Sequence, residues 1–434
     1  MKLNTLTLKN FRRFKNLEVT FHPELTVLAA RNGQGKTSVL DAATVALGTF
    51  VGAFDLGKSK SIEYRDARYQ RLPGQSDNEQ VYPVRIEATL DDLSGPVSRE
   101  LNSAKGRTTA KHAAELANIG KALMAGVREL EPVDLPLLAY YGSGRLWNAH
   151  KNMGRKAVLS ASRTMGYEDC FSSASSFTQV QQWMTKATLA VLQQKNMDAY
   201  EGYTLADQIE GIQNTVDKVL QNEGWSGFHY SVQHEELAMN HSDMGVLPVS
   251  QLSDGVRAMV SLVADMAWRC AKLNPQLGAH AQQKTQGIVF IDEVDMHLHP
   301  EWQQTVIQTL REAFPRIQFV VTTHSPQVLS TIRRDNIRVI QSYTSGDATA
   351  EIPLARTYGE PSNTVLQGVM FVDPQPPVAE KKELQRLTEL VDQGLYESSE
   401  ATDLMARLVK TLGKEHPQLT RLQRSIERQK ALQG

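Results

Sequence analysis

The feature that most constrains this chain is a short glycine-containing run near its N-terminus, residues 30–37. The run differs at one position from the phosphate-binding pattern G-x-x-x-x-G-K-[ST], because Ala30 stands where the first glycine is expected. An apolar segment, residues 25–29, precedes it, and a helix-compatible segment, residues 38–47, follows. The sequence therefore predicts the strand, loop and helix that the pattern needs, although a glycine-containing turn before an ordinary helix would also fit.

The residue types in this loop suit a nucleoside triphosphate. Glycines let backbone amides turn inward around phosphate oxygens, and the start of the next helix adds positive potential. We expect Lys36 to reach the β- and γ-phosphates and the Thr37 hydroxyl to bind Mg²⁺. The methyl group of Ala30 costs little if its backbone is extended and much if φ is positive, which leaves slow turnover open. The predicted nucleotide-binding residues here are Asn32, Gly33, Gly35, Lys36, Thr37 and Ser38.

A second pattern lies far along the chain, where the apolar run 288–291 ends in two acids, Asp292 and Glu293. This is typical of a buried parallel strand with carboxylates at its C-terminal end, where open α/β sheets bind ligands. Asp292 suits Mg²⁺, through water, and Glu293 can polarise the water that attacks a γ-phosphate. Two surface acids after a strand are the alternative, which the loop at 30–37 disfavours.

Composition sets outer limits. The 434 residues can bury one large core or two smaller ones, and the formal net charge of −1 gives no global sign of a nucleic-acid or membrane surface. Cys170 and Cys270 have no metal-binding spacing, which argues for a reducing compartment. Since no apolar run approaches the roughly 18 residues of a membrane span, and no signal peptide is apparent, we expect a soluble, cytoplasmic protein.

The chain divides into four stretches. Residues 1–150 open with a hairpin at 6–21 and, after the loop and its helix, continue as a polar, irregular part, 51–135, with one probable strand at 81–90. Residues 151–225 are expected to form an inserted helical lobe, and residues 226–372 to return to strands around the second pattern. The helices predicted within the lobe are 180–193 and 205–220.

Residues 373–434 follow a proline-rich break and carry leucines at helical spacing. The predicted helices are 383–392, 399–412 and, more loosely, 421–432. Two interpretations are balanced, a helical cap on the preceding part and a module that docks a partner protein.

An apolar strand at 137–141 runs into a glycine-flexible turn that ends at Arg145. This junction could bring Arg145 or a tyrosine to a nucleotide, or be a plain strand end. Around it, residues 101–165 hold ten Lys and Arg against four Asp and Glu, a candidate nucleic-acid or phosphate surface. A solvated face with few acids explains the same bias.

Two weaker patterns flank the acidic strand. Ser253 and Gly255 stand at the entrance to a predicted helix, 256–270, where a hydroxyl, close backbone approach and a helix N-terminus suit a γ-phosphate. A serine N-cap explains Ser253 equally well. His324 ends a β-branched strand, 319–323, and could bond a γ-phosphate or sense its loss, although a lone histidine there is usually structural.

The order of these motifs resembles the ABC-type ATPase heads of the RecF, SMC and OLD group, over roughly residues 1–50, 135–150 and 245–345. The Asn-Phe-Arg run at 10–12 ahead of the loop, and the His-Leu-His-Pro run at 297–300 after the acids, strengthen the likeness. Within the group, residues 140–147 and the C-terminal region resemble the PtuA family, the ATPases of Septu and of some retron antiphage systems.

The resemblance implies an α/β P-loop ATPase head that binds ATP and Mg²⁺ in a head-to-tail homodimer. Ser253 and Gly255 would cover the γ-phosphate held by the partner copy, and His324 would be the switch histidine. Arg12, or Arg13, would contact the adenine or its phosphates unless it is a surface charge. The catalytic residues implied are Glu293 and His324, and the metal-binding ones Thr37 and Asp292. His297 and His299 would shape the dimer-facing loop rather than bind metal, and the segment at 140–145 lacks the glutamine of the ABC Q-loop.

No Asp-x-Asp pair follows His324, and no zinc pair or HNH-like cluster occurs, so we predict no intrinsic nuclease. For a PtuA-like ATPase, cleavage would come from a separate HNH nuclease (PtuB-like), and in a retron also from a complex with the reverse transcriptase and its DNA–RNA product (msDNA). Two alternatives remain: a RecF-like DNA-repair clamp and a non-hydrolysing, nucleotide-gated scaffold.

Overall fold

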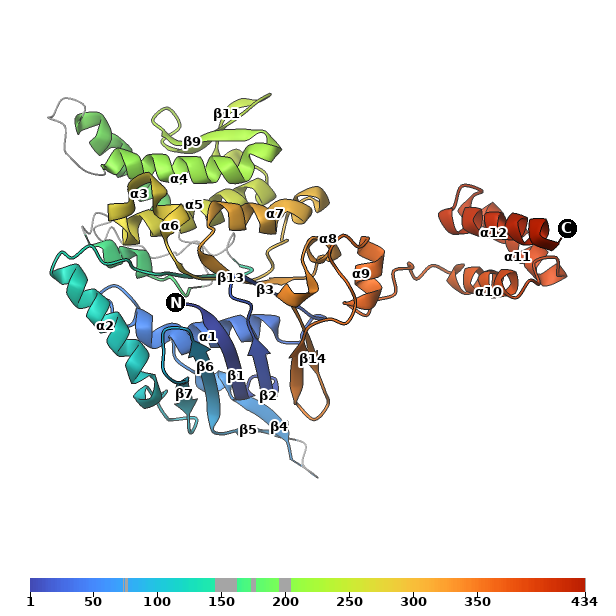
Figure 1. Cartoon of the computed structure of the whole chain (residues 1–434), viewed down its shortest axis with the longest axis horizontal. Coiled ribbons are helices and arrows are strands. Elements are labelled where there is room, and N and C mark those ends of the chain that lie inside the picture. Colours follow the sequence, from blue (N-terminus) through green and yellow to red (C-terminus); the bar gives the residue numbers. More distant parts are fainter. Residues whose placement is uncertain (73, 75–76, 145–161, 173–176, 195–203, 434) are drawn as a thin grey trace. The chain divides into compact units, whose positions relative to one another are not determined.

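The structure is a computed structural model, and it describes residues 1–72, 74, 77–144, 162–172, 177–194 and 204–433 (Figure 1). The chain forms two compact units, Met1–Met370 and Phe371–Gly434, each with its own hydrophobic core. Within the described part, no helix is both long enough and apolar enough to cross a membrane.

A six-stranded sheet lies at the centre of the first unit, in the order β15-β14-β3-β13-β12-β8. The strands from β14 to β8 run parallel, and β15 is antiparallel to β14. Every residue of β3, β8, β12 and β13 is buried, which explains their apolar sequences. The bounds are β3 Leu25–Ala29, β8 Leu137–Tyr141, β12 Gly287–Ile291, β13 Ile317–Thr323, β14 Ile337–Ser342 and β15 Ala348–Glu351.

Helix α1 (Lys36–Val51) lies between this sheet and a second, antiparallel sheet of order β2-β1-β6-β7. It contacts β8 and β13 on one side and β6 and β7 on the other, and most of its residues are therefore apolar. The predicted hairpin corresponds to β1 and β2. The bounds are β1 Leu3–Phe11, β2 Phe14–Thr20, β6 Val84–Leu90 and β7 Val97–Leu101.

The opposite face of the central sheet is covered by α5 (Asp254–Leu273), on which α4 (Leu205–Leu220) and α3 (Phe177–Gln194) pack (Figure 1). A small antiparallel sheet of order β11-β10-β9 packs on α4 and α3. The other bounds are β9 Trp225–Ser231, β10 Glu236–His241, β11 Gly245–Pro248, α6 Ala281–Lys284, α7 Pro300–Ala313, α8 Pro326–Ser330 and α9 Ser362–Gly368.

The expectation that residues 51–135 are largely irregular is wrong. They contain β4 (Arg68–Arg71), β5 (Asn78–Val81), β6, β7 and α2 (Ala114–Arg128). Strand β7 was missed because it buries polar side chains: Arg99 donates hydrogen bonds to the carbonyl oxygens of Val45 and Thr109. Helix α2 was missed because it contains glycines, which lower helix propensity.

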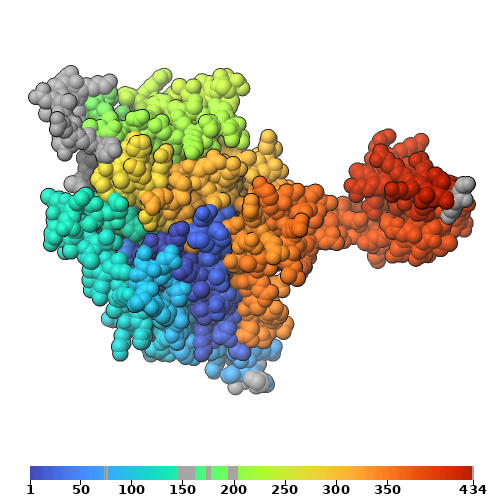
Figure 2. All heavy atoms as spheres, in the orientation of Figure 1, coloured from blue at the N-terminus to red at the C-terminus, as the bar shows by residue number. Residues whose placement is uncertain are grey.

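Two distant parts of the sequence meet beside the antiparallel sheet. Strand β2 contacts β15, and the Asn16 side chain donates to Asp347, 2.9 Å away. Figure 2 shows the blue N-terminal strands against the orange segment that contains β14 and β15. The central sheet and the antiparallel sheet β2-β1-β6-β7 are therefore joined at their edges as well as through α1.

The second unit consists of three helices, α10 (Lys381–Asp392), α11 (Ser399–Leu412) and α12 (Pro417–Gln433). The Ser398 hydroxyl caps α11 by accepting from the Ala401 amide. The unit's core consists of leucines, a valine and an alanine, among them Leu387, Val391, Leu408 and Leu419.

Candidate nucleotide site

The phosphate loop joins the end of β3 to the first turn of α1, as its sequence predicts. Lys36 is the first residue of α1, and its Nζ donates to the carbonyl oxygen of Ala30 at 2.9 Å. Burial lowers the pKa of Lys36, while the carboxylates of Asp292 and Glu293 act in the opposite direction. A bound triphosphate would supply the negative charge that this partly desolvated ammonium lacks.

The loop glycines adopt the left-handed backbone that only glycine accepts without strain. Gly33 has φ 73° and Gly35 has φ 93°, and a Cβ on Gly35 would lie 2.4 Å from the Phe14 ring. Ala30, by contrast, is buried and has no positive φ. Its methyl group therefore fits the loop without backbone strain, which answers the question that the altered motif raised.

Asp292 lies directly across from the loop. Its two carboxylate oxygens accept from the Thr37 hydroxyl at 2.8 Å and the Thr322 hydroxyl at 2.6 Å, and its backbone amide donates to Tyr141. A hydroxyl and a carboxylate in direct contact, both beside a phosphate loop, are the oxygen donors that Mg²⁺ prefers. The residues present therefore fit the metal that the fold implies.

Glu293 follows in a left-handed conformation, with φ 49°, and its amide donates to the Thr322 hydroxyl at 2.8 Å. The backbone turns sharply here and holds the carboxylate at the carboxyl edge of the sheet. Positive φ is uncommon for a residue other than glycine, and such positions cluster at functional sites.

His324 directly follows β13, the strand between β3 and β12. Burial lowers its pKa, and the nearby Lys36 lowers it further, so the imidazole is neutral at pH 7. The charges of Lys36 and Glu293 both influence the pKa of His324, so the imidazole lies within electrostatic range of these two residues.

Ser253 and Gly255 lie at the N-terminus of α5, far from the phosphate loop in sequence. In space, Gly255 lies against the segment that follows Glu293. Ser253 is the N-cap, yet its exposed side chain makes no capping hydrogen bond. Gly255 is buried, and a Cβ there would lie 2.4 Å from the carbonyl oxygen of His297. His299 is the N-cap of α7 and accepts from the Glu301 amide. In the described residues, no group of three or more His, Cys, Asp or Glu side chains could hold a metal ion.

The arginines of the first hairpin have different surroundings. Arg12 donates to Asp41 at 2.7 Å and to Asp66 at 2.9 Å, and it lies 3.5 Å from the Ser38 hydroxyl. Arg13 is exposed, and its aliphatic part lies against Gly35. Partial desolvation of its side chain lowers the pKa of Arg13. Arg13 makes no ion pair within the described part. Arg145 and the rest of the segment 145–161 lie outside the described residues.

Sequence reasoning gave no role to several residues at this site. Thr322 bridges Asp292 and Glu293, and Asp41 accepts from Arg12 and from Lys60 at 2.8 Å. Asp41 was detectable, because it lies one helical turn after Thr37 on the same face of α1. Lys60 could not be predicted, because nothing in its polar segment indicates which lysine contacts Asp41.

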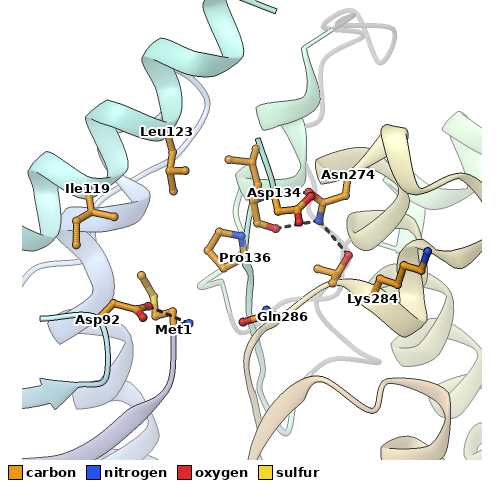
Figure 3. A pocket seen from close by; sticks show the side chains of 11 residues that line it. Met1, Asp92, Ile119, Leu123, Asp134, Pro136, Asn274, Lys284 and Gln286 are labelled. Atoms are coloured by element: carbon orange, nitrogen blue, oxygen red, sulfur yellow. Dashed lines mark hydrogen bonds and ion pairs between the residues drawn. The ribbon is translucent and has the colours of Figure 1, made fainter. Parts of the chain in front are cut away.

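A separate cavity of about 200 Å³ lies at the other end of the sheet, where residues 135–136 and 286 precede β8 and β12. Figure 3 shows Ile119 and Leu123 of α2 facing Met1 and Pro136 across it. Because the nucleotide motifs are all at the carboxyl ends of the strands, this cavity is not part of their site.

The fold and the site define a P-loop ATPase of the ABC type. A family model described as "AAA domain" matches residues 5–223, and a second, described as "AAA domain, putative AbiEii toxin, Type IV TA system", matches residues 189–330. The chain belongs to this AAA-domain family of ATPases.

Among similar proteins is the "Retron Vc95 probable ATPase" of Vibrio cholerae serotype O1 biovar El Tor, 26% identical over 78% of this chain and 73% of the relative. The "Septu protein PtuA" of Bacillus mycoides is 35% identical, but over 21% of this chain and 12% of its own length. The SMC head domain of Thermotoga maritima is 15% identical, with a TM-score of 0.42, over 82% of this chain and all of that domain. The predicted likeness to the antiphage ATPases is thereby confirmed.

Proposed function

We propose that this chain is the ATP-binding and hydrolysing subunit of an antiphage defence complex, with its nucleotide clamped between two copies. The observation that carries the proposal is the contact between the Thr37 hydroxyl and Asp292, 255 positions apart in sequence, beside the buried Lys36. Lys36 would bind the β- and γ-phosphates, and Asn32, Gly33, Gly35 and Ser38 would surround them. Arg13 is better placed than Arg12 for a further phosphate contact, since acids already neutralise Arg12.

Chemistry at this site follows from the positions of four side chains, two for the metal and two for the water and the γ-phosphate. Mg²⁺, held by Thr37 and Asp292, would neutralise charge on the phosphates during transfer. Glu293 would orient and deprotonate the attacking water, and the neutral His324 would donate a hydrogen bond to the γ-phosphate. Ser253 has an exposed hydroxyl with no capping bond, which supports a role toward the nucleotide of a partner copy.

Two variants separate binding from turnover. Lys36→Ala removes the main phosphate contact, so we expect no detectable binding of a fluorescent ATP analogue. Glu293→Gln keeps the side-chain size and loses the base, so we expect binding at wild-type affinity with turnover lowered by about 10²–10⁴-fold. Phosphate release measures turnover, and wild-type turnover in Glu293→Gln would contradict the role of Glu293.

Mixing two inactive variants tests the shared site. Lys36→Ala spoils a copy's own phosphate loop, whereas Ser253→Arg spoils the neighbour's site. In a random mixture half of the dimers are mixed and each has one intact site, so about one quarter of the wild-type activity should return. No recovery in the mixture would contradict a nucleotide shared between copies.

The partners belong to the same proposal. The likeness to a retron ATPase and to a Septu protein supports a complex in which a separate HNH nuclease performs cleavage. A reverse transcriptase with its DNA–RNA product is a further candidate partner. Co-purification of a small nuclease with the tagged chain would support this assignment.

A further inference from the structure

Tyr140 is a buried tyrosine whose hydroxyl group the roles given above leave unused. The residue is 4% exposed and lies in β8, the edge strand of the central sheet. Its hydroxyl makes no hydrogen bond with any other residue that the structure describes, although its neighbour Tyr141 donates to Asp265 at 2.7 Å. The hydroxyl oxygen keeps some contact with solvent although the residue as a whole is buried, so a bound ligand or its water shell can reach it.

Strand register places Tyr140 beside the metal-binding carboxylate. β8 and β12 are parallel, with Tyr140 opposite Phe290 and Tyr141 opposite Ile291. Since side chains alternate between the faces of a strand, Tyr140 shares a face with Asp292, and Tyr141 points to the other face, toward α5. Asp292 keeps this register, because its amide donates to the Tyr141 carbonyl at 2.8 Å.

The groups around Tyr140 already have partners. The Lys60 ammonium lies 5.2 Å from the centre of the Tyr140 ring and bonds Asp41, whose other oxygen accepts from Arg12. Both oxygens of Asp292 are taken as well. The Tyr140 hydroxyl therefore has no partner among the described residues, although these charged groups lie near its ring.

This environment also fixes the protonation state of the group. Burial, and then the carboxylates of Asp41 and Asp292, hold the pKa of Tyr140 well above its ordinary value. The phenol therefore stays neutral at physiological pH, and its oxygen can accept a hydrogen bond. Water bound to a divalent cation is a strong donor, because the cation draws electron density from the water oxygen.

We propose that the Tyr140 hydroxyl hydrogen-bonds the water shell of the Mg²⁺ that accompanies the nucleotide, and so positions the metal against Thr37 and Asp292. This inference rests on the proposed function, because it needs a metal–nucleotide complex at the phosphate loop. Tyr140 is a positioning residue here, since it acts through metal-bound water and touches neither phosphate nor metal. It would strengthen the hold on Mg²⁺ while leaving phosphate recognition to the loop.

Tyr140→Phe in the full-length chain tests the inference, with Tyr141→Phe as the matched control. We expect Tyr140→Phe to raise the Mg²⁺ concentration that half-saturates binding of a fluorescent ATP analogue by about five- to tenfold, the effect of one hydrogen bond. Without nucleotide, its melting temperature should equal the wild-type value, because the hydroxyl that is removed bonds no other residue that the structure describes. Tyr141→Phe should keep the wild-type Mg²⁺ dependence and melt at a lower temperature, because its bond to Asp265 is lost.

The outcomes separate this inference from the proposed function. If the wild-type chain fails to bind the ATP analogue at any Mg²⁺ concentration, the proposed function itself is wrong. If the wild-type chain binds and Tyr140→Phe shows the same Mg²⁺ dependence, or melts at a lower temperature, the role of Tyr140 is overturned while the nucleotide site stands.

Discussion

The positions of the phosphate loop differ in how strongly backbone conformation and packing restrict the residue, although the motif gives them equal weight. Gly35 combines φ 93° with close approach to the Phe14 ring, whereas Ala30 has no positive φ. Gly255 is constrained in another way, because it lies against the carbonyl oxygen of His297. Both glycines are required by contacts with parts of the chain that are distant in sequence.

A pair of substitutions tests this difference between the two ends of the loop. Ala30→Gly, which restores the usual motif, should leave nucleotide affinity within about twofold, because no strain is relieved. Gly35→Ala should weaken binding by more than tenfold, since the added methyl group meets Phe14 and disfavours the left-handed backbone. Titration with a fluorescent ATP analogue measures both, and equal affinities for the two variants would contradict the argument.

At the scale of elements, α5 is fixed to the central sheet by a buried polar network. The Asp265 carboxylate accepts from Arg269, 2.8 Å away, and from the Tyr141 hydroxyl, and both charged side chains are at most 2% exposed. Arg269 also donates to the carbonyl oxygen of Gly166. The network connects the helix that begins at Ser253 to β8, whose last residue bonds Asp292.

Breaking this network from one side should be costly. Arg269→Met leaves Asp265 buried without its counter-charge, so we expect a loss of about 3–5 kcal/mol in stability. The double variant Asp265→Leu with Arg269→Met removes both charges and should recover most of that loss. Thermal unfolding without nucleotide compares the three proteins, and a double variant no more stable than Arg269→Met would argue against a buried-charge penalty.

The sequence predicted well those elements whose burial is reflected in their composition. β3, α4 and α11 have the predicted limits, because continuous apolar runs or helical spacing mark them clearly. The order of the motifs along the chain also predicted one common site. Its predicted residues are Lys36, Thr37, Asp292, Glu293 and His324. The sequence failed for β7, where a buried arginine disguises a strand, and for Lys60 and the environment of Tyr140, which depend on tertiary contacts between segments without a local pattern.

At the scale of the whole molecule, the two units have separate hydrophobic cores. The core of Phe371–Gly434 contains none of the residues that form the core of Met1–Met370, and every nucleotide-site residue lies in the larger unit. We therefore expect the larger unit to fold without the smaller one, whether the smaller unit is a helical cap or docks a partner.

Deleting residues 371–434 tests this division. We expect the remaining chain to bind ATP with unchanged affinity. Its melting temperature should lie within a few degrees of that of the first unit in the full-length protein, because no residue of the first unit's core is removed. Co-purification of a nuclease partner, if the smaller unit docks it, should be lost. A shortened chain that no longer bound ATP would show that the second unit supports the site directly.

The strand order of the central sheet also has a consequence for synthesis on the ribosome. β3, which leads into the phosphate loop, pairs on one side with β13 and on the other with β14, both made far later than itself. Until residues 317–323 have emerged from the exit tunnel, β3 has neither hydrogen-bonding neighbour, and Thr37 has no Asp292 until the residue after β12 has emerged. We therefore expect the phosphate loop to be completed only late in synthesis, after most of the chain has left the ribosome.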